Sequence, residues 1–181
     1  MNIHIFGASG SGTTALGKTL SEDMDLPHFD SDNYYWKDTD PPFTQKNTVE
    51  ERHKLLLQDM KGLSGWVLSE SMDSWSRPFI PLFTAVIFVL ADADLRVERL
   101  REREYSDYGD RIKIGGDMFD EHEYFIKWAH QYDTGELSGR SLKRHKEWIR
   151  SLTCPVLTVN NNQAYDDMVT AVKDWLHDKA K

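Results

Sequence analysis

A glycine-rich segment near the start of the chain has the residues that a phosphate-binding loop needs. It reads Gly-Ala-Ser-Gly-Ser-Gly-Thr-Thr over residues 7–14, between a strand-like run and an amphipathic helix. The glycine spacing and the final hydroxyl, that of Thr14, match the phosphate-loop pattern of Gly, four residues and Gly-Lys-Ser/Thr. Glycines let successive backbone N–H groups converge on one point, and the helix N-terminus adds a positive dipole end. We expect the nucleotide phosphates to contact Gly10, Ser11, Gly12, Thr13 and Thr14.

One position departs from this pattern, because Thr13 stands where the lysine belongs. That lysine normally neutralises the β- and γ-phosphates as a point charge. Binding through the backbone, with Mg²⁺ at the Thr14 hydroxyl, is still expected. Catalysis would need positive charge from elsewhere in the chain.

Two other interpretations of the glycine-rich segment stay open at this stage. It contains Gly-x-x-Gly-x-Gly, which differs from the Gly-x-Gly-x-x-Gly of a dinucleotide-binding loop, although Asp30 and Asp32 follow at about the distance of a ribose-binding acid. It is also compatible with a Gly/Ser turn of purely structural importance. The strand–loop–helix context favours phosphate binding over both.

Carboxylates follow the next two strand-like runs. Asp30 and Asp32 come at the end of the second, and Glu70 directly after the third. In a parallel α/β sheet the ligand crevice lies at the carboxyl ends of the strands. An Asp-x-Asp pair there can hold Mg²⁺ through water and accept a proton from a substrate hydroxyl, although an Asx turn or helix cap is the simpler alternative. Glu70 is a lone carboxylate and is therefore a weaker candidate for binding a substrate hydroxyl or a metal-bound water.

Arginines gather in two later segments. Arg99 and Arg103 are four residues apart and share a helical face; Arg111 follows them in a glycine-containing segment. Arginines carried by a closing lid stabilise the charge on a transferring phosphoryl group. The second segment contains Arg140 and Arg144, which also share a face and could meet the phosphates from the other side. Interleaved glutamates favour a salt-bridged surface for the other basic residues of the first segment, Arg96 and Arg101.

The elements that must position these residues alternate between strand and helix. Residues 85–91 are apolar throughout, which is typical of a central parallel strand covered on both faces. The alternation predicts an α/β protein with a parallel sheet. We expect strands at 3–6, 27–30, 66–69, 85–91 and 155–159, helices at 13–24, 49–60, 92–104, 119–130, 141–152 and 165–177, and a mobile loop at 105–117.

Composition narrows the class of protein. The 181 residues include 39% hydrophobic and 29% charged side chains, an ordinary globular balance. The formal net charge of −8 argues against general affinity for nucleic acid or anionic membranes. The single cysteine precludes an internal disulfide framework, and no apolar run approaches the roughly 18 residues of a membrane span. With no signal peptide visible, we expect a cytoplasmic protein.

The chain resembles the P-loop kinases of the adenylate kinase and shikimate kinase type, in particular a bacterial adenylate-kinase-related, topology-modulation-like subgroup with the loop lysine replaced. The resemblance extends over nearly the whole chain. It rests on residues 7–14, 30–36, 40–43, 99–104, 115–118 and 140–148.

The resemblance implies a three-layer P-loop nucleoside-triphosphate hydrolase fold formed by residues 1–181 as one domain. It implies a five-stranded parallel sheet with helices on both faces, an acceptor region at about 30–65 and a small lid at about 104–118. By similarity, Asp32 lies at the acceptor or magnesium site, Arg99 near the adenine together with residues 160–162, and Arg103 at the phosphates. Glu70 stands where adenylate kinases have a glycine, so AMP is not the expected acceptor.

The expected function is therefore transfer of the γ-phosphoryl group of ATP to a small molecule, either a nucleotide or a hydroxyl compound. The expected catalytic residues are Asp32, Arg103 and Arg140, with Mg²⁺ held at Thr14 and Asp32. The alternative is a non-catalytic nucleotide sensor, which the threonine at position 13 favours. Either protein would bind a nucleotide, act as a monomer or homodimer, and need neither nucleic acid nor a membrane.

Overall fold

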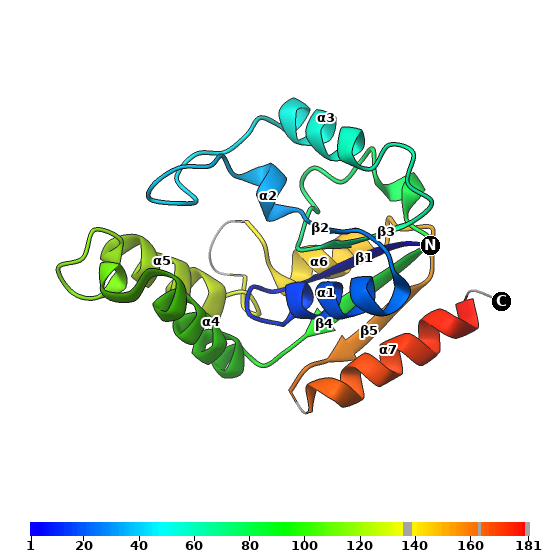
Figure 1. Cartoon of the computed structure of the whole chain (residues 1–181). Helices are drawn as coiled ribbons and strands as arrows, with labels where there is room; N and C mark the ends of the chain where they lie inside the picture. The colour runs from blue at the N-terminus through cyan, green and yellow to red at the C-terminus, as the bar shows by residue number, and fades with distance from the viewer. Residues whose placement is uncertain (136–138, 163, 180–181) are drawn as a thin grey trace.

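Five parallel strands form one sheet, with helices on both of its faces (Figure 1). The computed structural model describes residues 1–135, 139–162 and 164–179. The strands are β1 (Asn2–Gly7), β2 (His28–Asp30), β3 (Trp66–Ser69), β4 (Ala85–Leu90) and β5 (Val156–Asn160). Their order across the sheet is β2-β3-β1-β4-β5, and every neighbouring pair is parallel. The carboxyl ends of all five strands therefore open on one edge.

Helices connect the strands in the order that the alternating pattern predicts. They are α1 (Thr13–Met24), α2 (Asp32–Tyr35), α3 (Val49–Asp59), α4 (Ala93–Tyr108), α5 (Phe119–His130), α6 (Leu142–Ile149) and α7 (Tyr165–Lys179). Two short 3₁₀ turns, η1 (Ile80–Leu82) and η2 (Gly109–Ile112), complete the described elements.

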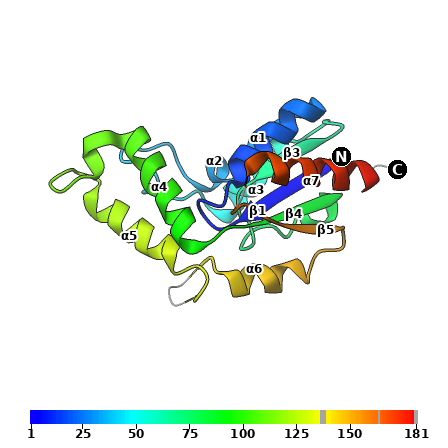
Figure 2. The ribbon, with the colours of Figure 1, turned by 90° about the horizontal axis from the view of Figure 1, so that it is seen from below.

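One face of the sheet is covered by α1 and α7, which lie side by side in both ribbon views (Figure 2). Ile3 and Ile5 of β1 point into this layer because alternate residues of a strand face opposite sides. Leu16 and Leu20 of α1 are one turn apart and pack against them, together with Val172 of α7. The layer is a continuous apolar core that fixes where α1 begins.

The opposite face is rich in aromatic side chains and is covered by α3 and α6. Phe6 and Phe88 stack on neighbouring strands with ring centroids 4.7 Å apart. Trp148 of α6 packs edge-on against Phe6 at 4.8 Å, and Leu56 of α3 is fully buried in the same cluster. Since both faces of the sheet are covered, the three-layer α/β fold with a five-stranded parallel sheet is confirmed.

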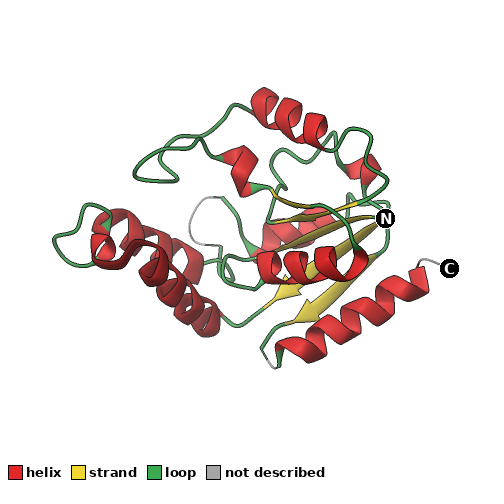
Figure 3. Ribbon diagram, in the orientation of Figure 1, coloured by secondary structure: helices red, strands yellow, loops and turns green. Residues whose placement is uncertain are grey.

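Helices α4 and α5 pack against each other as a pair. Figure 3 shows that this pair extends beyond the carboxyl ends of the strands. Leu100, Ile126 and Ala129 form a small separate core between the two helices. This pair therefore stands beside the edge where β1, β2 and β3 end.

The expectation of a mobile loop over residues 105–117 is wrong for its first part. Helix α4 continues through Tyr108, and η2 follows immediately. The sequence has no glycine or proline between Glu104 and Gly109, so nothing interrupts the helix until Gly109, whose φ of 56° ends it. Helices α1 and α5 and strand β3 have the expected bounds, and the other expected elements, apart from α4, differ by one to three residues at their ends.

Within the three described ranges, no helix combines the length and apolar character that crossing a bilayer requires.

Candidate functional site

The glycine-rich loop joins β1 to α1 at the carboxyl edge of the sheet. Gly10 and Gly12 have φ values of 80° and 96°, a left-handed conformation that favours glycine. Gly12 is the N-cap of α1, and among the described residues no side chain caps this helix start. The first amide groups of α1 are therefore available to an anion, which a helix N-terminus also attracts through its dipole.

Both threonine hydroxyls at the start of α1 point to Glu70. The buried Thr13 hydroxyl donates a short hydrogen bond to Glu70 Oε1. The Thr14 hydroxyl lies 2.8 Å from the same oxygen and 3.4 Å from Asp30 Oδ2. Glu70, which directly follows β3, therefore contacts the side chain at position 13, where the phosphate-loop pattern has a lysine.

Asp30, Asp32 and Glu70 crowd this edge with negative charge. Burial raises the pKa of Asp30 to about 7, and the charges of Glu70 and Asp32 act in the same direction. Burial likewise raises the pKa of Asp32 to about 6, with Glu70 adding to the effect and Arg140 and Arg103 opposing it. Both carboxyl groups therefore exchange protons near neutral pH, as a general base requires.

A cavity of about 190 Å³ lies between the loop and α4. Its lining residues are Gly10, Gly12, Thr13, Thr14, Ala15, Glu70, Arg99, Leu100 and Arg103. Arg99 donates to the carbonyl oxygen of Asn161 at 3.0 Å, which joins α4 to the turn after β5. The two arginines that share a helical face thus line the same cavity as the loop.

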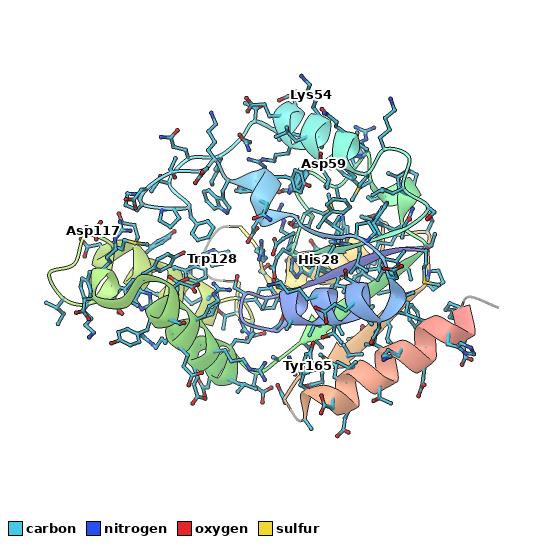
Figure 4. The ribbon with its side chains drawn as sticks, viewed as in Figure 1. His28, Lys54, Asp59, Asp117, Trp128 and Tyr165 are labelled. Atoms are coloured by element: carbon cyan, nitrogen blue, oxygen red, sulfur yellow. The ribbon has the colours of Figure 1, made fainter. Side chains whose placement is uncertain are left out.

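Arg140 approaches the loop from the opposite side. Its guanidinium lies 3.4 Å from the Ser9 hydroxyl and 3.8 Å from Glu70 Oε2. It also lies 5.9 Å from the ring centre of Trp128, which Figure 4 shows on α5. The sequence-predicted residues therefore converge: the loop, Asp32, Arg99, Arg103 and Arg140 all lie at one edge of the sheet.

Other arginines of the two basic segments serve elsewhere. Arg96 is fully buried and donates to two carbonyl groups and to Asp133. Arg101 pairs with Glu123 on the surface, and Arg144 pairs with Asp73. Arg111 bonds Asp117 and Asp40 at 2.7 Å each, so it joins η2 to the segment after α2.

Arg52 of α3 is buried. Its guanidinium lies 3.7 Å from the ring centre of Tyr35, and Nε donates to the carbonyl oxygen of Asn47 at 2.9 Å. The cation–π contact with the Tyr35 ring stabilises the buried guanidinium charge. Arg77, which follows β3, is exposed.

The sequence alone gave Glu70 too small a role. It placed residues 160–162 near the adenine, but it did not predict the bond between Asn161 and the loop or that between Ser9 and Arg140. Asn161 is buried, and its amide donates to the carbonyl oxygen of Ser11 at 2.8 Å, which holds the loop from the β5 side. The signal for Glu70 was its place directly after β3, the strand beside β1. Only the strand order shows that these two strand ends are neighbours.

The donors at this edge suit magnesium rather than a softer metal. Thr14, Asp30, Asp32 and Glu70 offer only oxygen atoms, and Mg²⁺ takes one or two protein oxygens together with phosphates and water. Within the part of the chain that the structure describes, no three His, Cys, Asp or Glu side chains are arranged to hold a metal ion by themselves. The residues fit an ion that arrives with a nucleotide.

The sheet order and the loop define the class: a nucleotide-binding P-loop protein with a kinase-type fold. A family model described as an AAA domain matches residues 3–125, and the chain belongs to this family. The uncharacterized protein YqaC of Bacillus subtilis (strain 168) is 39% identical over 175 residues, covering 97% of each chain.

Solved kinases share this fold at low sequence identity. Shikimate kinase from Bacteroides thetaiotaomicron has a TM-score of 0.58 at 14% identity, covering 98% of both chains. Shikimate kinase from Acinetobacter baumannii, in complex with shikimate, has a TM-score of 0.54 at 16% identity, covering 99% of this chain and 95% of that chain. Deoxyadenosine kinase from M. mycoides, with bound dATP, has a TM-score of 0.55 at 12% identity, covering 98% and 100%. These likenesses confirm the predicted resemblance to P-loop kinases.

Proposed function

We propose that the protein is a phosphotransferase that moves the γ-phosphoryl group of ATP to a hydroxyl- or phosphate-bearing small molecule in the cytoplasm, where ATP is plentiful. The observation that carries the proposal is the convergence of a phosphate loop, carboxylates and arginines at one edge of the sheet. Phosphoryl transfer needs these parts, since it depends on positioning and charge stabilisation.

The donor side consists of the loop amides, Arg99 and Thr14. The loop and the start of α1 hold the phosphates, while Arg99 and the turn at Asn161 border the base. Thr14 and Asp32 would hold Mg²⁺, which neutralises charge on the donor phosphates when it is bound. Residues 104–118 form a lid over this site, and residues 30–65 form the acceptor region.

The acceptor side centres on Asp32. Its carboxylate orients the acceptor hydroxyl and takes the proton as the acceptor oxygen bonds to the γ-phosphorus. The bond from that phosphorus to the β–γ bridging oxygen breaks, and ADP leaves with the electron pair. A pKa of about 6 lets Asp32 start unprotonated at neutral pH. Arg103 and Arg140 stabilise the charge on the transferring group.

Arg103→Ala tests the role of Arg103 at the transferring phosphoryl group. We expect turnover to fall by about a hundredfold or more, with a much smaller change in ATP affinity, because the charge of Arg103 is needed most in the transition state. ADP formation is measured with Mg-ATP and a panel of nucleotides, nucleosides and sugar acids, and ATP affinity by calorimetry.

Arg101→Ala is the matched control, since Arg101 lies on the same helix but pairs with Glu123 at the surface. It should leave both quantities nearly unchanged. Equal losses of turnover and affinity in Arg103→Ala would contradict a role of Arg103 in the transition state.

A second candidate is a nucleotide sensor without catalysis. Thr13 in place of the lysine favours it, because the hydroxyl brings no positive charge to the phosphates. Tight ATP binding without ADP formation on any acceptor of the panel would support the sensor over the phosphotransferase.

A further inference from the structure

Glu70 stands in closer contact with the phosphate loop than any other carboxylate at this edge. Its Oε1 accepts hydrogen bonds from both Thr13 and Thr14, and its Oε2 lies 3.8 Å from the Arg140 guanidinium. Its side chain is only 13% exposed. It also lines the cavity between the loop and α4. The negative charge is thus built into the wall of the expected phosphate site.

The backbone holds Glu70 in this position against its own preference. Its φ of 70° lies in the left-handed region, which costs a residue with a side chain conformational energy. The residues on both sides are anchored: Ser69 Oγ lies 2.9 Å from His28 Nε2, and Ser71 Oγ lies 2.8 Å from His145 Nε2. Such a conformation persists only where the surroundings impose it, which points to a function for the side chain.

A carboxylate here reverses the electrostatics of an ordinary phosphate loop. The lysine of the pattern would offer a positive charge to the phosphates, whereas this chain offers a neutral hydroxyl backed by a negative charge. Arg140 offsets part of that charge, but it is shared with Ser9. Arg99 and Arg103 also line the cavity, but Glu70 is the charged side chain bonded to the loop threonines. Its charge therefore lowers the affinity for metal-free nucleotide phosphates relative to a neutral side chain at this position.

We propose that Glu70 makes nucleotide binding conditional on a divalent cation, a role that rests on the proposed nucleotide site. The threonine at position 13 and Glu70 then form a matched pair. The hydroxyl keeps the carboxylate in place without neutralising it, so a divalent cation must supply the charge that the lysine supplies in other loops. Metal-free nucleotide therefore binds more weakly than the metal-bound form.

Glu70→Gln tests this role through the affinity for ADP, measured by calorimetry with Mg²⁺ and with EDTA. In the wild type, Mg²⁺ should tighten ADP binding strongly. In the variant, metal-free ADP should bind about tenfold tighter than to the wild type, because the repelling charge is gone. The Mg²⁺ effect should shrink by at least the same factor. A purely structural role would instead weaken both forms equally.

Two further variants keep the test decisive. Asp73→Asn removes another carboxylate that follows β3 and is 9% exposed, but it pairs with Arg144 rather than with the loop. It should leave the Mg²⁺ dependence unchanged. Glu70→Gly removes the same charge at a left-handed position that glycine favours, and it provides the test if Glu70→Gln does not fold.

The outcomes separate this inference from the proposed function. ADP binding to the wild type with a Mg²⁺ dependence that neither Glu70→Gln nor Glu70→Gly reduces would overturn the role of Glu70 alone. Absence of nucleotide binding to the wild type, with or without Mg²⁺, would overturn both proposals.

Discussion

The ring of His145, in α6, contacts the segment that follows β3 and the segment that follows α5. Nε2 lies 2.8 Å from the Ser71 hydroxyl next to Glu70, and Nδ1 lies 2.8 Å from the Tyr132 hydroxyl beyond α5. The ring is fully buried, and burial lowers its pKa to about 3, helped by the nearby charges of Arg140, His4 and Arg144. Neutral His145 therefore stabilises the segment that carries Glu70.

This shift predicts a loss of stability in acid. The unfolded chain takes up a proton on His145 below a pH of about 6.5, whereas the folded protein does so only near pH 3. Protonation thus favours the unfolded state, by about 1.4 kcal/mol per pH unit between these values. The stability advantage of the wild type over His145→Gln should fall by about 2 kcal/mol from pH 6.5 to pH 5.

Urea unfolding of both proteins across this range measures the effect. His4, whose pKa burial also lowers to about 3, and the raised pKa values of Asp30 and Asp32 are common to both proteins and cancel in the difference. A difference that stays constant with pH would contradict the prediction.

The phosphate loop depends on α4 for its shape. A methyl group at Gly10 would lie 2.5 Å from the carbonyl oxygen of Arg96 in the first turns of α4. The loop and the helix that carries Arg99 and Arg103 are therefore in direct backbone contact, so a change in one displaces the other.

Gly10→Ala and Gly62→Ala separate this contact from backbone strain. Gly10 and Gly62 have nearly equal φ values of +80° and +81°. Among the described residues, however, nothing lies within 4 Å of a methyl group built at Gly62. Gly62→Ala should cost about 1–2 kcal/mol of unfolding free energy from left-handed strain alone. Gly10→Ala should cost a further 1–3 kcal/mol or so from the clash and should also weaken nucleotide binding.

Denaturant unfolding and calorimetry provide the two measurements. Equal destabilisation by the two substitutions, or unaltered nucleotide affinity in Gly10→Ala, would show that α4 does not constrain the loop.

The α4–α5 pair is attached to the rest of the molecule through polar contacts as well as its own small core. Arg96 donates to the carbonyl oxygen of Ala91 at 3.0 Å and to that of Ala129 at 2.9 Å, and it pairs with Asp133. Its guanidinium also lies 5.1 Å from the ring centre of Tyr132. One side chain thus connects the end of β4 to the end of α5.

Arg96→Ala should therefore lower the free energy of unfolding by about 3 kcal/mol, because it leaves buried carbonyl groups unsatisfied. Arg101→Ala, on the same helix, removes an ion pair whose side chains are 50% and 48% exposed, and should cost no more than about 0.5 kcal/mol. Thermal or denaturant unfolding compares them, and similar losses would refute the structural role of Arg96.

Much of the fold was predictable because its signals are local. The helix over Thr13–Met24 and the strand over Trp66–Ser69 have the predicted bounds, since apolar spacing and flanking glycines act within a few residues. Strand β4, which is buried except at Leu90, was equally clear from its unbroken apolar run. The continuation of α4 to Tyr108 was missed because three glycines nearby suggested a loop, although only Gly109 ends the helix.

The phosphate loop, its missing lysine and the parallel α/β class could all be predicted from the sequence, because they depend on spacing within one segment or on the alternation of strands and helices. Tertiary structure alone decided which distant residues complete the site. Glu70 meets Thr13 across 57 residues, and Arg140 meets Ser9 across 131. Such contacts follow from the order of strands in the sheet, which pairs β1 with β3. The loop that lacks a lysine thereby faces a glutamate, a relation that no local pattern contains.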